Sequence, residues 1–169
     1  MTSSRERVIP TGASSGPPRS QAVIKPAGRP ENGNLATPIN SSGFTERFFS
    51  ILPAYRQGLS PVRRGLEVGL MHGLIVYVPF AKLGPLRDTA NANLAGLLSA
   101  VGLTVILTTA IYLYGLSNPP KPTALQTAAP NPPAELSKGQ GWQQYAQGFL
   151  VGSLIGAAIA YLIVNVTGF

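Results

Sequence analysis

Two residues in the first strongly apolar segment carry groups that could do chemistry, namely Glu67 and His72. His72 is the only histidine, and the chain has no cysteine, so a cysteine–histidine catalytic pair and cysteine-ligated clusters are excluded. Three roles stay open for the imidazole: a hydrogen bond to another helix, ligation of a metal ion in a cofactor, or proton transfer. The five-residue spacing argues against a pair between His72 and Glu67 within one helix.

Glu67 is costly at membrane depth, because an unpaired carboxylate there must be protonated or find a partner. Arg63, four residues earlier, is the nearest partner on the same helix. A salt bridge near the membrane interface is one interpretation. The other is a hard oxygen ligand for Mg²⁺, whose negative charge Arg63 or Arg64 would offset.

Glycines recur every four residues around the histidine, at Gly65, Gly69 and Gly73. At about 100° per residue they form one stripe, with His72 on it and Glu67 on the opposite face. Small residues would clear space for a flat macrocycle bound to the imidazole. A close contact with another helix would use the same glycines.

A second stripe lies in the last apolar segment, at Gly148, Gly152 and Gly156, followed by Ala160. Small residues at this spacing are typical of helices that pack closely in membranes. The two stripes therefore predict contact with each other, with another subunit, or with a pigment.

The composition indicates a membrane protein with a basic end. Charged residues make up 11% and the mean hydropathy is +0.17, while an ordinary soluble domain has about 25% charged residues. Residues 1–65 hold nine of the thirteen Lys and Arg and three of the six acids, so the net charge of +7 comes mostly from them. This asymmetry places the basic end on the cytoplasmic side. No nucleic-acid partner is expected, because the basic region has few aromatic residues and no binding motif.

Apolar length and proline positions predict an all-α membrane protein with three transmembrane helices and an extended, partly disordered N-terminal arm. Three spans put the chain termini on opposite sides of the membrane. The N-terminus and the Pro-rich loop should be cytoplasmic or stromal, and the C-terminus luminal. The divisions are a disordered basic arm at 1–33, an interfacial segment at 34–60, spans at 61–80, 94–116 and 146–166, a luminal loop at 81–93, and a Pro-rich loop at 117–141.

The interfacial segment should contain a short helix, capped by Ser42 or Thr45 and ended by Pro53. Its apolar residues share one side, so we expect it in the membrane interface, on a partner, or on the chain's own loops. Pro79 should end or kink the first span. Asp88 is expected to be a solvated cap for the second.

Several longer motifs resemble one family. They are Asn34–Asn40, Leu52–Arg56, Gly58–Pro61, Arg64–Gly69, His72–Gly73, Phe80–Asp88 and Asn93–Leu97. Together they resemble subunit XI of the photosystem I reaction centre. The resemblance implies a non-enzymatic subunit of the thylakoid membrane that binds chlorophyll a and β-carotene, with Glu67 and His72 as the chlorophyll Mg ligands. It also implies contact with other photosystem I subunits, membrane lipid and neighbouring photosystem I monomers.

Two further features follow from the resemblance alone. A calcium site of trimeric members would fall on Asp88 and the Pro85 carbonyl. The C-terminal extension of trimeric members is missing after Phe169, and a Pro-rich loop is the pattern of tetrameric members, so a tetramer is expected. The expected oligomer interface comprises Gly148, Gly152, Gly156, Pro119, Pro120 and Pro122.

A different class of function uses the same carboxylate. A small oligomeric channel or carrier could place Glu67 on an ion path. Such a protein would be expected to carry a second intramembrane charge, which this sequence does not show.

Overall fold

The described part of the chain is helical apart from one short pair of strands. A computed structural model describes residues 25–26, 35–119 and 133–168. Three of its helices are long and apolar enough to cross a membrane: α2 (Pro61–Leu83), α3 (Ala92–Leu116) and α4 (Gly139–Thr167). The expected all-α fold with three candidate spans is confirmed.

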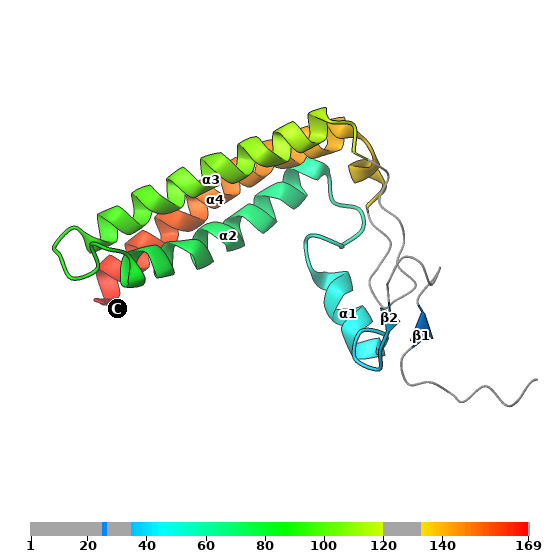
Figure 1. The fold of residues 1–169 in the computed structure, drawn as a ribbon, viewed down its shortest axis with the longest axis horizontal. Coiled ribbons are helices and arrows are strands. Elements are labelled where there is room, and N and C mark those ends of the chain that lie inside the picture. Colours follow the sequence, from blue (N-terminus) through cyan, green and yellow to red (C-terminus); the bar gives the residue numbers. More distant parts are fainter. Residues whose placement is uncertain (1–24, 27–34, 120–132, 169) are drawn as a thin grey trace, which may run out of the picture.

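The three long helices lie side by side in one bundle (Figure 1). Helix α1 (Gly43–Ile51) lies apart from it, beside the end of the bundle at which α2 begins. The strands β1 (Lys25–Pro26) and β2 (Leu35–Ala36) pair antiparallel next to α1. The rest of the expected arm at 1–33 lies outside the described residues.

Local signals explain where the first two helices begin. The Ser42 hydroxyl accepts a hydrogen bond from the Thr45 backbone N–H and caps α1. The Ser60 hydroxyl accepts one from Arg63 N–H and caps α2, and Pro61 occupies its first turn. Both beginnings agree with the expected signals.

Two expected boundaries differ from the structure. Pro79 lies inside α2, which continues to Leu83 instead of ending near Phe80. The N-terminal cap position of α3 is Asn91, while the Asp88 side chain is exposed and pairs with Arg87. Asp88 therefore does not cap α3, because it lies outside the first turn.

The end of the Pro-rich loop is more ordered than a spacer would be. Residues Ala134–Ser137 form the 3₁₀ turn η2, and α4 begins at Gly139, seven positions before the expected Ala146. The Trp142 indole N–H donates to the Leu136 carbonyl at 2.8 Å and fastens this turn to α4. Pro120 and Pro122 lie outside the described residues, and Pro119 is the last residue described before them.

The two glycine stripes face each other, and the contact between α2 and α4 is the most extensive in the bundle. A Cβ at Gly65 would collide with the Tyr145 carbonyl, and one at Gly152 would collide with the Leu66 carbonyl. Backbone therefore touches backbone along this contact, which only residues without a side chain permit. We call this contact the glycine seam.

The glycine seam shows that the two glycine stripes contact each other, and not another subunit or a pigment. Gly148, Gly152 and Gly156 are buried against α2 of the same chain, where each added Cβ would meet backbone atoms. They are not on an outer surface, so the expectation that they form the oligomer interface is wrong. The physical reason is that two complementary stripes in one chain satisfy each other.

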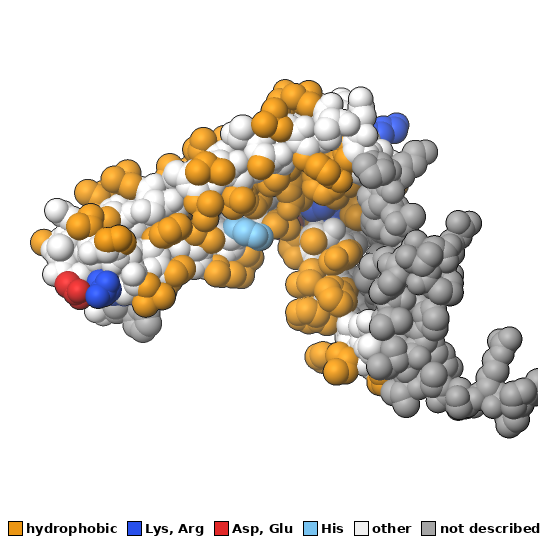
Figure 2. All heavy atoms as spheres, viewed as in Figure 1, with side chains coloured by type: hydrophobic (Ala, Val, Ile, Leu, Met, Phe, Trp, Pro, Cys, Tyr) orange, Lys and Arg blue, Asp and Glu red, His pale blue; other side chains and the backbone are white. Residues whose placement is uncertain are grey.

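The rest of the core is also built from small side chains around one buried tyrosine. Large apolar side chains lie instead on the outside, where they cover the bundle (Figure 2). This distribution suits a helical bundle surrounded by lipid or by other apolar chains. The buried cluster is Tyr77, Ala81, Ala100, Ala157, Ala160 and Val164.

Candidate functional site

His72 lies on the outer surface of α2, surrounded by hydrophobic side chains (Figure 2). Its Nδ1 is 2.9 Å from the carbonyl oxygen of Val68, one turn earlier. A carbonyl can only accept a hydrogen bond, so Nδ1 carries the proton and donates it. The lone pair of the neutral imidazole is therefore on Nε2, the nitrogen farther from the helix backbone.

The ring is also held from the side by a neighbouring helix. Phe149 of α4 packs edge-on against it, with ring centroids 5.4 Å apart. The space beside Gly69 and Gly73 is filled by α4 backbone, so these glycines serve helix packing. Any flat ligand on His72 must consequently lie against the outer side of the bundle.

The geometry favours one of the three roles left open for the imidazole. The hydrogen bond of His72 goes to its own helix, and no other described helix of this chain supplies a polar bond to the ring. A fixed tautomer with one ring nitrogen donating to a carbonyl is the arrangement in which histidines bind metal ions. The chemistry of this nitrogen therefore fits the central Mg²⁺ of a macrocycle.

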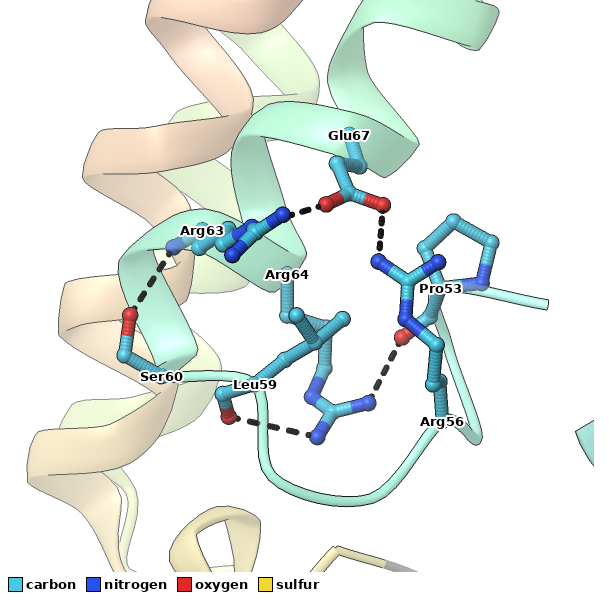
Figure 3. A network of polar contacts seen from close by, with 7 residues as sticks. All are labelled: Pro53, Arg56, Leu59, Ser60, Arg63, Arg64 and Glu67. Atoms are coloured by element: carbon cyan, nitrogen blue, oxygen red, sulfur yellow. Dashed lines mark hydrogen bonds and ion pairs between the residues drawn. The ribbon is translucent and has the colours of Figure 1, made fainter. Parts of the chain in front are cut away.

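Glu67 is held by two arginines (Figure 3). Arg63 Nε is 3.0 Å from Oε1, which confirms the expected salt bridge within the helix. Arg56 reaches from the preceding loop and places Nη2 2.5 Å from Oε2. The Glu67 side chain keeps 25% of its surface exposed, so it is only partly enclosed by these partners.

Arg64 does not take part in the ion pairs with Glu67. Its side chain is fully buried and points to the other side, where Nη1 donates to the Pro53 carbonyl at 2.6 Å. Nη2 donates to the Leu59 carbonyl at 3.4 Å and to Glu135 Oε1 at 2.9 Å (Figure 3 shows the two carbonyls). Arg64 therefore ties the loop before α2 and the turn η2 to the first turn of α2.

The carboxylate of Glu67 retains the capacity to bind a cation. Each of its oxygens uses one acceptor position for an arginine, and a carboxylate has about four such positions. Two positive charges lie against one negative charge, so the charge of a ligating carboxylate is offset locally. The donor chemistry thus fits Mg²⁺, with Arg63 and Arg56 as the compensating groups instead of Arg63 or Arg64.

Asp88 and Pro85 do not by themselves form a calcium site within this chain. The Asp88 side chain is 83% exposed, and its Oδ2 lies 3.4 Å from Arg87 Nε. Pro85 is also exposed. Among the residues that the structure describes, no group of three or more acidic or histidine side chains could hold a metal ion. One acid beside a guanidinium supplies too few oxygens for Ca²⁺, which takes about six to eight.

Sequence reasoning missed Arg56 and Glu135 as partners. They lie 11 positions from Glu67 and 71 positions from Arg64, respectively. Helical spacing reports only neighbours three or four positions apart, so it could not indicate either pair. The family resemblance at Leu52–Arg56 was the single signal that included one of them.

Comparison with known proteins places these features in context. The family model described as "Photosystem I reaction centre subunit XI" matches residues 22–169. A photosystem I reaction center subunit XI of Trichormus variabilis is 54% identical over 149 residues, which cover 88% of this chain and 86% of that protein. The subunit XI of Synechococcus elongatus is 51% identical over 146 residues, covering 86% of this chain and 88% of the relative.

Proposed function

The chain belongs to the photosystem I reaction centre subunit XI family, and from this we propose that it binds chlorophyll and joins photosystem I monomers. As a family member it is a non-enzymatic component of a chlorophyll-containing complex and a partner of other photosystem I components. Its three apolar helices fit a thylakoid membrane protein.

The proposal rests chiefly on the fixed tautomer of His72. Nδ1–H is used by the Val68 carbonyl, and Nε2 is left as the basic nitrogen on a lipid-facing surface. A neutral imidazole in apolar surroundings would suit the central Mg²⁺ of a chlorophyll a macrocycle. Bound there, chlorophyll would supply light absorption and excitation transfer. The residues of this chain would position it, with Phe149 holding the ring that ligates it.

Glu67 is the second proposed chlorophyll ligand. Its carboxylate is fixed by Arg63 and Arg56, so its orientation is set before pigment binds. This arrangement gives no support to the channel or carrier alternative, because a carboxylate held by two arginines is poorly suited to pass ions. β-carotene, which the family resemblance implies, would require only an apolar surface. The exposed side chains of Leu98, Ile106 and Leu113 on α3 offer one.

The contact between monomers cannot use the second glycine stripe, which is buried in the seam. We place it instead on the outer apolar side of the bundle and on the Pro-rich loop that begins near Pro119. A proline-stiffened loop loses less entropy on docking than a flexible one. The loop pattern supports a tetramer arranged as a dimer of dimers. Mass measurement of the gently solubilised complex tests this, and a dominant trimer would defeat it.

The basic N-terminal arm supports a cytoplasmic or stromal N-terminus and a luminal C-terminus. Trypsin added from the cytoplasmic side should then cut the arm after Arg5, Arg7 and Arg19, none of which precedes a proline. The loop between α2 and α3, which carries Arg87, is the internal control and should stay intact. The reverse pattern of cleavage would overturn the orientation.

The pigment assignment is tested by replacing His72. His72→Leu should remove one chlorophyll from the assembled complex, seen as lower chlorophyll content per complex and a lost band in the low-temperature absorption spectrum. Met71→Leu changes the neighbouring exposed residue without removing a ligand, so it should keep the full pigment content. Full pigment density at this position in a structure of His72→Leu would reject the assignment.

A further inference from the structure

Helix α1 presents an apolar face that the described part of the chain leaves uncovered. None of its nine residues is buried, and Phe44, Phe48 and Ile51 are 81%, 48% and 61% exposed. Their spacing of four and three places them on one face of the helix. Glu46 and Ser50 lie on the opposite face and are also exposed.

The remaining aromatic residue of α1 is used differently. Phe49 lies off the apolar face and packs edge-on against Tyr55, with ring centroids 5.4 Å apart. This contact braces α1 against the loop that follows it. Phe48 touches Phe49 edge-on, with ring centroids 5.8 Å apart, but about half of its surface stays exposed, and Phe44 and Ile51 are more exposed still.

The C-terminal end of α1 is fixed at the depth where α2 enters the membrane. Ile51 ends the helix two positions before Pro53, whose carbonyl accepts from Arg64 at 2.6 Å. Three positions further, Arg56 pairs with Glu67 in the second turn of α2. These two bonds hold the segment after α1 beside the first two turns of α2. In a spanning helix that begins at Pro61, those turns lie at the level of the lipid headgroups.

The direction of α1 completes the geometry. It runs across the direction of the spanning helices instead of along it (Figure 1). A helix across the spans at headgroup depth lies in the plane of the membrane. Hydrophobic side chains cover the side of α1 that is turned toward the length of the bundle (Figure 2). That side faces the hydrocarbon layer.

We propose that α1 is an interfacial helix that inserts Phe44, Phe48 and Ile51 among the acyl chains of the membrane lipid. Glu46 and Ser50 then face water. Arg47 on α1 is exposed and places a basic group at headgroup depth, where it suits an anionic lipid phosphate. This charge pattern and the shared depth favour lipid over another protein subunit as the partner of this face.

A photocrosslinker in the assembled complex tests the proposal in its native membrane. Phe48→p-benzoylphenylalanine places the reactive ketone on the apolar face, and Ser50→p-benzoylphenylalanine is the matched control one-half turn away. On irradiation, position 48 should gain the mass of a membrane lipid and position 50 should not. Phe44→p-benzoylphenylalanine is the second variant if the first impairs assembly.

Each other result counts against the proposal. A crosslink from positions 44 and 48 to another photosystem subunit would show that a protein covers the face. Reaction of neither position with lipid would show that the face is solvated. Equal lipid adducts at positions 48 and 50 would show that the helix does not lie with one face toward the acyl chains.

Discussion

Arg64 and Glu135 lie 71 positions apart in the sequence, yet Arg64 Nη2 donates to Glu135 Oε1 at 2.9 Å. The guanidinium is fully buried, whereas the Glu135 side chain remains 32% exposed. The ion pair joins the first turn of α2 to the turn η2 that precedes α4. The ends of two spans are thus connected outside the glycine seam.

Replacing the acid by its neutral analogue should destabilise this end of the bundle. Glu135→Gln leaves the Arg64 charge buried without a counter-ion, and we expect a loss of about 1–2 kcal/mol, less than for a fully buried pair. Glu46→Gln removes the same charge from an exposed side chain and is the control. Thermal unfolding of the solubilised complex gives the midpoint temperature of each variant. If Glu135→Gln and Glu46→Gln unfolded at the same midpoint temperature, the structural role of the ion pair would be contradicted.

The same pair predicts a dependence of stability on pH. Burial by itself raises the pKa of Glu135, but its backbone hydrogen bond and the Arg64 guanidinium outweigh burial and leave the pKa below its ordinary value of 4.5. The unfolded chain therefore takes up this proton at a higher pH than the folded chain. The contribution to stability is complete above the unfolded pKa and is lost as the pH falls through the lower, folded pKa.

Glu135→Gln should remove that part of the pH dependence. Unfolding of the parent protein and the variant, followed from neutral pH down into the acid range, should show two curves that converge as the pH falls. A constant difference between the curves across the whole range would mean that ionisation of Glu135 contributes nothing.

The glycine seam predicts which single methyl groups the bundle cannot accommodate. At Gly69 an added Cβ would meet the backbone of Phe149, so Gly69→Ala should force α2 and α4 apart and cost about 1–3 kcal/mol. At Gly102 in α3 an added Cβ would meet nothing within 4 Å, so Gly102→Ala should be tolerated. The yield and the thermal stability of the assembled complex are measured for Gly69→Ala and for Gly102→Ala. A tolerated Gly69→Ala would show that the helices are not in backbone contact.

Substitutions of Glu67 separate a pigment ligand from a simple salt bridge. Glu67→Gln keeps a side-chain oxygen and should retain the chlorophyll, whereas Glu67→Leu has no donor and should lose it. Pigment content per assembled complex is the measurement. If both variants kept the same pigment content, Glu67 would serve only to pair with Arg63 and Arg56.

The sequence was sufficient for features that depend on neighbouring residues. Ser60 and Pro61 marked the start of α2 because capping and proline preference act within one turn. Apolar length identified the three spans. The spacing from Arg63 to Glu67 indicated their salt bridge. Each of these signals is confined to a few consecutive positions, so no knowledge of the fold was needed.

Other features depended on how distant segments meet. Two equivalent glycine stripes indicated close packing, but only the fold shows that Gly69 and Gly152 belong to one internal contact. At the early start of α4 Trp142 bonds to Leu136, in a stretch whose prolines suggested an extended spacer. The tautomer of His72 follows from the position of a carbonyl oxygen, which residue types do not encode.

The glycine seam has a consequence for how this chain tolerates sequence change. In most soluble proteins the bulkiest interior residues are the least replaceable, because removing them leaves cavities. Here the positions with no side chain at all, such as Gly65 and Gly148, leave no room for even one carbon atom. Large residues on the periphery, such as Leu98 and Ile106, can exchange with other apolar residues as their surroundings change. Between the glycine seam and the outer surface, substitutional constraint therefore falls as side-chain size increases, the inverse of the usual order, whereas buried Tyr77 follows that order.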